Sequence, residues 1–357
     1  MTNNMVKKLK VFHGPLNYGT QAGLLAKGLR EKGVYVRSYS KADRFFREID
    51  YHFKPRKTLL GKVFFYKIWY PLVRVKCFFK YNTFHFYFGR TLLENQKDLK
   101  LYRLFGKKVI MEHLGNDVRN YQLLVERYNL PKHHHFYKNM EVHDAKVEKR
   151  LNYEDKFIDY RMVCLPTHVD FLNSYGFKTK AILPLAIDIK QFTYISKTQN
   201  KEAITIMHAP TNRIFKGTEY IEKAINKLKN EGYKIELNLV EGVTHEELIE
   251  EYKKCDLFID QISVGWYGTA ALEAMAIGRS VCAFIDERYF EYIDYSEDIP
   301  VLNINKENVT EKLREIIKSK ENLPDIGKKS RKFVENYHDK SSVANSLFQI
   351  YNQVWSQ

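Results

Sequence analysis

The sequence predicts an α/β fold made of two Rossmann-like domains whose parallel sheets face an interdomain cleft. Strand-like apolar runs alternate with helix-patterned segments along the chain, and this alternation starts again after residue 200. The length of 357 residues is sufficient for two domains. Charge is also divided, because residues 1–200 hold 37 basic and 17 acidic side chains, whereas residues 201–357 hold 21 and 26.

The first half opens with a strand, a loop, a helix and a second strand. Residues 9–12 form the first predicted strand, and a loop that contains Gly14 and Gly19 follows it. Residues 20–32 carry apolar side chains at helical spacing and are followed by Gly33, which is typical of a helix end. The pattern predicts further strands at 34–38, 83–88, 108–112, 162–165 and 181–183.

The second half repeats this alternation. Strands are predicted at 204–208, 234–240, 257–260 and 281–285, and helices at 218–230, 245–254, 268–277, 309–318 and 328–357, the last of them interrupted. The alternation predicts a first domain at 1–186, a linker at 187–200, a second domain at 201–335 and a closing helical segment at 336–357. We expect this last segment to cross back to the first domain.

The composition excludes several classes of protein. No run of 18 apolar residues is present, and the start of the chain lacks the apolar stretch of a secretory signal, so a cytoplasmic protein is expected. The four cysteines lie far apart without a Cys-x-x-Cys pair, which favours reduced core thiols. The tract from His133 to His135 is interpreted as surface, because consecutive side chains point in different directions. No metal or cofactor is expected.

The basic half contains a stretch rich in aromatic residues. Residues 44–88 hold 16 aromatic residues and 10 Lys or Arg, but only two acids. Rings interleaved with cations suit the headgroup layer of an anionic membrane, with Trp69, Tyr70, Arg74 and Lys76 on the membrane or acceptor face. The alternative is that 83–88 is a buried strand and that much of the rest is ordinary core. No nucleic-acid-binding motif accompanies the basic residues.

A candidate anion site lies in the second half, in the segment 265–278. Gly268 follows a strand and opens a helix, and small residues stand behind it. A ligand can therefore approach backbone N–H groups at the N-terminus of this helix, which makes an anion site suited to a diphosphate. Glu273 lies just over one turn further on, and its carboxylate is suited to two ribose hydroxyls; the alternative is a solvated or capping Glu.

Two cations follow the first strand of the second half. Arg213 and Lys216 lie in a predicted loop between the strand at 204–208 and the helix at 218–230. Directed into the interdomain cleft, both would neutralise a leaving diphosphate without a metal ion. Taken alone, an Arg and a Lys in a loop are more often surface charges.

The stretch from His208 to Ile285 resembles the donor-binding half of retaining glycosyltransferases of group 1, the family-four class with the GT-B fold. Lys216-Gly217 matches the family's Lys-Gly pair. The segment 265–278 is similar to its Glu-x7-Glu signature, with Glu273 as the second Glu. Upstream, 183–188 with Phe192 is similar to the connection at the end of the first domain, 113–117 to the His-Gly-x-Asp segment, and 14–19 to the N-terminal glycine loop.

The resemblance implies a role for each matching residue. Glu273 would bind the ribose, and Lys216 would bind the donor diphosphate. Arg213 stands three residues before Lys216, whereas the family Arg stands five before, where Thr211 is found. Backbone N–H groups of Gly268, Thr269 and Ala270 would bind phosphate. His113 would support the donor sugar. Gly14 and Gly19 would border the acceptor and the diphosphate.

The largest departure from the family is Gly265, which stands where the first signature Glu is expected. In the family that carboxylate contacts hydroxyls of the transferred sugar. Its absence leaves the donor sugar undefined and weakens any mechanism with a carboxylate nucleophile at this position. Asp260, five residues upstream at a strand end, is a candidate to replace it.

The resemblance implies a metal-independent, retaining transfer of a sugar from a UDP- or GDP-linked donor to a glycan or lipid-linked acceptor. Assembly of a surface polysaccharide at the inner face of a membrane is the setting that it suggests. A binder of nucleotide sugars without catalytic activity remains an alternative because of Gly265. A nucleic-acid-binding protein is a weaker one. A Rossmann oxidoreductase is disfavoured, because no Gly-x-Gly-x-x-Gly follows the first strand.

Overall fold

A computed structural model describes residues 9–41, 48–54, 57–131, 135–196 and 202–356. The chain divides into two compact units. The first contains residues 1–123, 140–186 and 340–357, and the second contains residues 124–139 and 187–339. The segment 124–139 therefore belongs to the second unit, although the sequence analysis assigned it to the first domain. The predicted α/β class with parallel sheets is confirmed.

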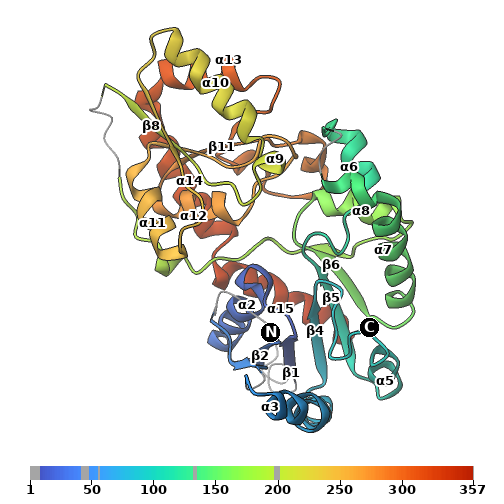
Figure 1. Ribbon diagram of the computed structural model, residues 1–357. Helices are drawn as coiled ribbons and strands as arrows, with labels where there is room; N and C mark the ends of the chain where they lie inside the picture. The colour runs from blue at the N-terminus through green and yellow to red at the C-terminus, as the bar shows by residue number, and fades with distance from the viewer. Residues whose placement is uncertain (1–8, 42–47, 55–56, 132–134, 197–201, 357) are drawn as a thin grey trace. The chain divides into compact units, whose positions relative to one another are not determined.

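The first unit is built on a seven-stranded parallel sheet of order β3-β2-β1-β4-β5-β6-β7 (Figure 1). The order changes direction between β1 and β4, and Gly14 ends β1 at this point. The strands are β1 (Lys10–Gly14), β2 (Tyr35–Ser40), β3 (Tyr51–His52), β4 (Thr83–Tyr87), β5 (Lys108–His113), β6 (Tyr160–Val163) and β7 (Ala181–Ile182).

Helices cover both faces of this sheet. The longer ones are α2 (Gln21–Glu31), α3 (Leu59–Phe64), the π-helical turn η2 (Phe65–Trp69), α4 (Tyr70–Lys80), α5 (Leu99–Leu104), α6 (Tyr121–Tyr128), α7 (Met140–Glu154), α8 (Thr167–Ser174) and α15 (Lys340–Ser356); α6 continues into the second unit. One core contains side chains of α2 and α15 with alternate strand residues. The opposite core contains residues of η2, α4 and α5 with the other set of alternate strand residues.

The second unit is built on a five-stranded parallel sheet of order β12-β11-β10-β8-β9. Its strands are β8 (Ile204–His208), β9 (Ile235–Leu239), β10 (Leu257–Ile259), β11 (Ser280–Ala283) and β12 (Leu302–Asn303). Its helices include α9 (Arg213–Lys216), α10 (Thr218–Asn230), α11 (His245–Lys254), α12 (Thr269–Ile277), α13 (Val309–Lys318) and α14 (Leu323–Tyr337). The core under α10 and α13 is aliphatic.

The sequence pattern placed most strands of both sheets and most helices of the second unit correctly. Three helices, α10, α11 and α13, begin and end where they were predicted. The strands β3 and β12 and the helix α5 were not predicted. Residues 213–216 form the short helix α9 instead of a loop, because the Asn212 side chain accepts a hydrogen bond from the Phe215 N–H and caps it. The helices at 59–80, 121–128, 140–154 and 167–174 were not predicted.

The cysteines and the described helices bear on the classes of protein considered from the sequence. All four cysteines are buried, and no disulfide joins them. Among the described residues, no helix is long and apolar enough to cross a membrane. The part of the chain that the structure describes also contains no group of three metal-ligating side chains. His133 and His134 of the histidine tract lie outside the described residues.

Candidate functional site

The sheet of the second unit brings together two strand ends that are distant in sequence. β8 pairs with β9 on one side and with β10 on the other, so the winding of the sheet changes direction at the β8–β10 pair. Parallel sheets bind ligands beyond the carboxyl ends of the strands at such a switch point. His208 ends β8, and Asp260 directly follows β10. The candidate site is therefore built around these two ends.

Lys216, Asp260 and Gly268 meet at this place. The Lys216 Nζ forms an ion pair with Asp260 Oδ1. The Gly268 N–H donates to Asp260 Oδ2 at 2.9 Å. The Ile262 N–H also donates to the Lys216 carbonyl at 3.2 Å, which ties α9 to the loop after β10. Asp260 is 1% exposed, so its carboxylate depends on these donors for its charge.

The cluster has the chemistry of an anion site that a protein carboxylate already occupies. Gly268 is the N-cap of α12, where the helix dipole and the first-turn N–H groups favour negative charge. Lys216 adds a full positive charge, and Asp260 supplies the anion. Thr269 and Ala270, in the first turn of α12, are half-buried and leave this helix start accessible.

Glu273 lies one turn along α12 from this cluster. Its side chain is 12% exposed, and its Oε1 is 3.0 Å from His245 Nε2 at the start of α11. The alternative of a fully solvated Glu273 does not fit this contact, and the role of Glu273 toward a ribose stays a prediction. His245 was not singled out in the sequence; its only signal was a position at the start of a predicted helix after a strand.

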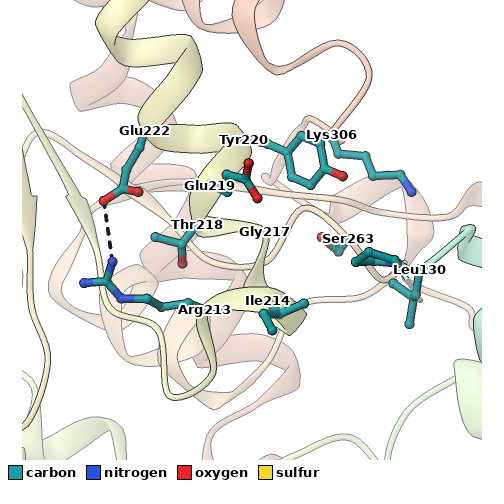
Figure 2. A pocket seen from close by; sticks show the side chains of 11 residues that line it. Leu130, Arg213, Ile214, Gly217, Thr218, Glu219, Tyr220, Glu222, Ser263 and Lys306 are labelled. Atoms are coloured by element: carbon teal, nitrogen blue, oxygen red, sulfur yellow. Dashed lines mark ion pairs between the residues drawn. The ribbon is translucent and has the colours of Figure 1, made fainter. Parts of the chain in front are cut away.

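Arg213 contacts two acidic partners outside the cluster around Asp260. Its guanidinium bonds the Glu241 carboxylate, with Nε at 3.0 Å from Oε1, and lies 3.7 Å from Glu222 of α10. Figure 2 shows Arg213 directed at Glu222 beside a cavity of about 260 Å³. Of the sequence-predicted site residues, all of which the structure describes, Arg213 alone lines this cavity. The structure therefore does not bring Arg213 into the cluster around Asp260.

His208 is a buried support of the site that sequence reasoning missed. Its Nδ1 donates to the Ile259 carbonyl at 2.8 Å, and its Nε2 accepts from the Thr218 hydroxyl at 2.9 Å. Burial lowers the pKa of His208 to about 4, so the ring is neutral at neutral pH. It joins the ends of β8 and β10 to the first residue of α10. No local pattern reveals this role, because the partners lie 10 and 51 residues away.

The structure gives a physical reason for Gly265. A Cβ at this position would lie 2.3 Å from the Asp286 Cβ and 2.9 Å from the Tyr128 hydroxyl, so the space for a side chain is already filled. Asp286 follows β11 and pairs with Arg288, while Tyr128 comes from α6. The absence of the signature Glu is therefore built into the packing of the second unit.

Gly14 and Gly19 lie beyond β1 in the first unit. Gly14 has a φ of 144°, and a Cβ there would meet the Tyr39 carbonyl oxygen at 2.4 Å, so only glycine fits. Gly19 has a φ of 53° in the turn before α2. Both glycines therefore shape the chain at the switch point between β1 and β4.

His113 is fully buried at the end of β5, inside a charged network. Its Nδ1 lies 2.8 Å from Asp117 Oδ2, and its Nε2 lies 3.6 Å from the buried carboxylate of Glu154, which also pairs with Arg150. Burial raises the pKa of Asp117, but the hydrogen bond and charge of His113 and the charge of Arg150 bring it below its usual value. The other Asp117 oxygen accepts the N–H groups of Leu114 and Gly115, which fixes this loop.

A larger cavity lies beside this network. It has a volume of about 1,050 Å³, and Asp117, Arg150, Tyr121 and His143 are among its lining residues. His113 does not line this cavity. Its ring contacts Asp117, which does line the cavity, and so helps to fix the position of that carboxylate.

The four residues predicted for a membrane or acceptor face separate into two groups. Trp69 and Lys76 are exposed, and Arg74 is half-buried with its guanidinium 5.0 Å from the Tyr70 ring centre. The prediction that Tyr70 lies on this face is wrong, because Tyr70 is 5% exposed and its hydroxyl donates to the Leu92 carbonyl at 3.2 Å. It points inward because it packs on Phe65 and Phe53 in the core under the sheet.

Residues 191–333 match the model of the family described as "Glycosyl transferases group 1". The matched segment contains Lys216, Asp260, Gly268 and Glu273, and it lies within the second unit. No curated protein matches the chain.

Solved structures share the fold along nearly the whole chain. Sucrose-phosphate synthase from Thermosynechococcus elongatus superposes with a TM-score of 0.63 at 15% identity, covering 98% of this chain and 96% of that one. Anabaena HepE in complex with UDP and glucose superposes with a TM-score of 0.61 at 10% identity, covering 96% of this chain and 99% of that one. The catalytic domain of starch synthase IV from Arabidopsis thaliana, bound to ADP and acarbose, superposes with a TM-score of 0.59 at 15% identity, covering 98% of this chain and 100% of that one.

At these identities the structural likeness concerns the fold, and it confirms the GT-B architecture expected from the sequence. The similarity to the group 1 glycosyltransferases is carried by residues 191–333, within the second unit. The chain therefore contains a segment that matches this family, and along nearly its whole length it has the GT-B fold.

Proposed function

We propose that the protein transfers a sugar from a nucleoside diphosphate sugar to a glycan or lipid-linked acceptor, with retention of anomeric configuration and without a metal ion. One observation carries the proposal. Lys216 and the start of α12 converge on a single buried carboxylate at the switch point of the second sheet. Two donors that hold a carboxylate there are equally suited to a diphosphate.

In the donor complex the diphosphate takes over the partners of Asp260. Lys216 Nζ and the N–H groups of Gly268, Thr269 and Ala270 face the phosphate oxygens, and Glu273 accepts hydrogen bonds from the ribose hydroxyls. His245, 3.0 Å from Glu273, orients that carboxylate. Anabaena HepE, which shares the fold, has been crystallised with UDP and with UDP-glucose, which favours a uridine nucleotide as the first donor to test.

The chemistry follows from where charge develops. The bond between the anomeric carbon and the diphosphate oxygen breaks, and its electron pair leaves with the diphosphate. The acceptor hydroxyl oxygen forms the new bond on the same face of the sugar, and its proton passes to the departing diphosphate. Lys216 and the α12 dipole oppose the charge that develops on the leaving group. His113 contributes indirectly, by fixing Asp117 and the loop that follows β5.

Titration calorimetry with UDP, GDP and ADP tests the nucleotide site. The wild type should bind at least one of the three, and K216A should weaken that binding at least tenfold, because it removes a charge-assisted contact. K227A, an exposed lysine on α10, serves as the matched control and should bind like the wild type. Absence of binding to all three nucleotides by the wild type would refute the proposal.

A transfer assay tests the reaction itself. Sugar transfer from the cognate donor should persist in excess EDTA, and NMR of the product should show the donor's anomeric configuration. E273A should weaken donor binding. Inversion, or loss of activity on metal removal, would contradict the corresponding part of the proposal.

A second candidate function is binding of a nucleotide sugar without transfer. Gly265 favours it, because Asp286 and Tyr128 fill the space of the signature carboxylate. Nucleotide binding that persists with neither donor hydrolysis nor transfer to any glycan or lipid-linked sugar would support this candidate over the enzyme.

The proposed setting is assembly of a surface polysaccharide, with the protein acting peripherally at the inner face of a membrane. The basic character of the first half of the chain supports this setting. A lipid-linked acceptor would present its sugar at that surface, within reach of a protein bound there.

A further inference from the structure

Helix α4 has apolar side chains on two opposite faces. Tyr70 and Cys77 point inward and belong to the core under the sheet. Leu72, Val75 and Phe79 form a second stripe at helical spacing, and all three are exposed, Phe79 by 73%. The outward stripe therefore plays no part in the packing of the core.

The preceding helix and π-helical turn expose still more apolar surface. Leu59, Leu60, Val63 and Phe64 of α3 are exposed, Leu60 by 83%, and Ile68 of η2 is exposed as well. Within this segment Phe65 is the side chain that packs into the core. A helix without a buried face of its own is unusual in a soluble protein and indicates a partner.

The apolar surface continues onto α5. Phe78 of α4 contacts Phe105, just after α5, with ring centres 5.3 Å apart. Leu101, Leu104 and Phe105 are exposed next to this contact. The exposed side chains of residues 59–79 and 101–105 thus form one surface of the first unit, here called the α3–α5 face.

The charges on this face have one sign. Residues 51–93 include nine Lys and Arg but no Asp or Glu, and residues 99–111 also have no acid. Lys62, Lys67 and Lys76 are exposed among the apolar side chains. The face therefore combines exposed rings and aliphatic groups with positive charge, which is the chemistry of a helix that lies in the interface of an anionic bilayer.

We infer that the α3–α5 face binds the surface of an anionic phospholipid bilayer, with α3, η2 and α4 lying in the headgroup layer and their apolar stripes entering the acyl boundary. A second copy of the chain is a poorer occupant. A symmetric dimer would place two basic, acid-free surfaces against each other, and like charges oppose such contact.

This inference deepens the proposed function and rests on it only for the purpose of binding, which is to bring the protein to a lipid-linked acceptor. Lipid binding by the α3–α5 face stands or falls independently of nucleotide binding by the second unit. The two are measured separately: vesicle flotation reports the first, and titration with UDP, GDP or ADP reports the second.

The experiment is flotation of the full chain with vesicles of phosphatidylcholine alone or with 30% phosphatidylglycerol, at 0.1 M and 0.5 M salt. The wild type should float with anionic vesicles at 0.1 M salt and bind neutral ones far more weakly. The triple variant K62Q/K67Q/K76Q should reduce partitioning on the order of a hundredfold, since each lysine near an anionic surface contributes about fivefold. K223Q/K227Q/K229Q on α10 is the matched control, with the same loss of charge from exposed positions.

A second pair of variants tests the apolar contribution. L72E/F79E should abolish flotation, whereas V142E/V243E, at exposed apolar positions elsewhere, should leave it unchanged. Failure of the wild type to float with anionic vesicles, or wild-type flotation by both test variants, would overturn the inference. So would light scattering that shows a wild-type dimer converted to a monomer by L72E/F79E, because the face would then be an interface between copies.

Discussion

Asp260 is the residue on which the properties of the candidate site depend most directly. It holds Lys216 and the Gly268 N–H in place, and it does so as an anion in a place suited to phosphate. A diphosphate entering this site meets a like charge that must give up its donors. Asp260 therefore organises the site and opposes the binding of an anionic ligand at the same time.

D260N should reverse this balance. The amide oxygen can still accept from the Gly268 N–H, but the like charge is gone, so the affinity for the cognate nucleotide should rise about tenfold. The variant without nucleotide should melt at a lower temperature, because the largely buried Lys216 loses its counter-charge. Calorimetric titration and thermal melting check both effects.

D256N is the control for that experiment. Asp256 is a buried aspartate before β10 that accepts the Thr205 N–H at 2.9 Å, far from the carboxyl ends of the strands. Its loss should lower stability without increasing nucleotide affinity. Unchanged or weaker binding by D260N would show that Asp260 supports the ligand rather than competing with it.

At this scale the sequence indicated those candidate site residues that stand in a recognisable local motif. Glu273 and Gly268 stand in one motif, and Lys216 precedes the Gly that ends α9. It did not find His208, His245, Asp286 or Tyr128, because their partners are distant in sequence. Asp260 was singled out as a candidate to replace the signature Glu, and the structure shows its contacts with Lys216 and Gly268, which the sequence did not predict. Its role toward the donor stays a prediction.

At the scale of elements, the turn between α9 and α10 sets the position of Lys216. Gly217 has a φ of 80°, and a Cβ there would lie 2.5 Å from Ile262 Cγ1 and 2.8 Å from Ser263 Oγ, in the loop that follows β10. The two elements that carry Lys216 and Asp260 therefore meet at a glycine.

G217A should weaken nucleotide binding as well as stability. The added methyl group pushes α9 away from the loop after β10, and Lys216 moves with α9, so we expect a several-fold loss of affinity. G232A is the control, because Gly232 also has a positive φ, 94°, but a Cβ there meets nothing within 4 Å. Both variants carry the backbone penalty. Equal nucleotide affinities in the two would contradict the argument, and titration calorimetry measures the difference.

The sequence predicted elements well where one face of a helix is apolar and its ends are marked. Helix α11 begins with a capping box between Thr244 and Glu247, and α10 begins after Gly217; both were placed correctly. Helix α3 was missed because none of its residues is buried, and α4 was missed because apolar residues lie on both its inner and its outer face. Neither helix shows the single apolar stripe that marks a helix in the sequence. The same property that hid these helices produces the α3–α5 face.

At the scale of the whole chain, the C-terminal helix α15 returns to the first unit, where it packs on α2. Tyr351 of α15 links two buried histidines of the sheet, at 2.7 Å from His13 Nε2 and 2.8 Å from His85 Nδ1. His85 Nε2 lies 3.0 Å from Glu112, and His13 Nδ1 lies 2.9 Å from the Tyr87 hydroxyl. One proton per link satisfies the hydrogen bonds from His85 through Tyr351 and His13 to Tyr87, and a protonated Glu112 adds no charge to this buried network.

The pH dependence of stability tests that network. Burial raises the pKa of Glu112 to about 8, so between pH 4.5 and 8 the folded protein holds a proton that the unfolded chain has released. This group's contribution to stability is complete below pH 4.5 and is lost as the pH rises toward 8. Burial lowers the pKa of His85 to about 3 and that of His208 to about 4, so their contributions are lost as the pH falls below 6.5.

Between pH 6.5 and 8 the pH dependence of stability is therefore set mainly by Glu112. As the pH rises over this range, the free energy of unfolding should fall by at most about 1.4 kcal/mol per pH unit. E112Q keeps a donor toward His85 but has no proton to lose, so its stability should stay level over this range. E141Q, at an exposed position on α7, should retain the wild-type slope. Urea titrations at pH 6.5, 7.2 and 8.0 measure the three slopes. A wild-type slope of zero, or a slope that persists in E112Q, would contradict the assignment of this pH dependence to a protonated Glu112.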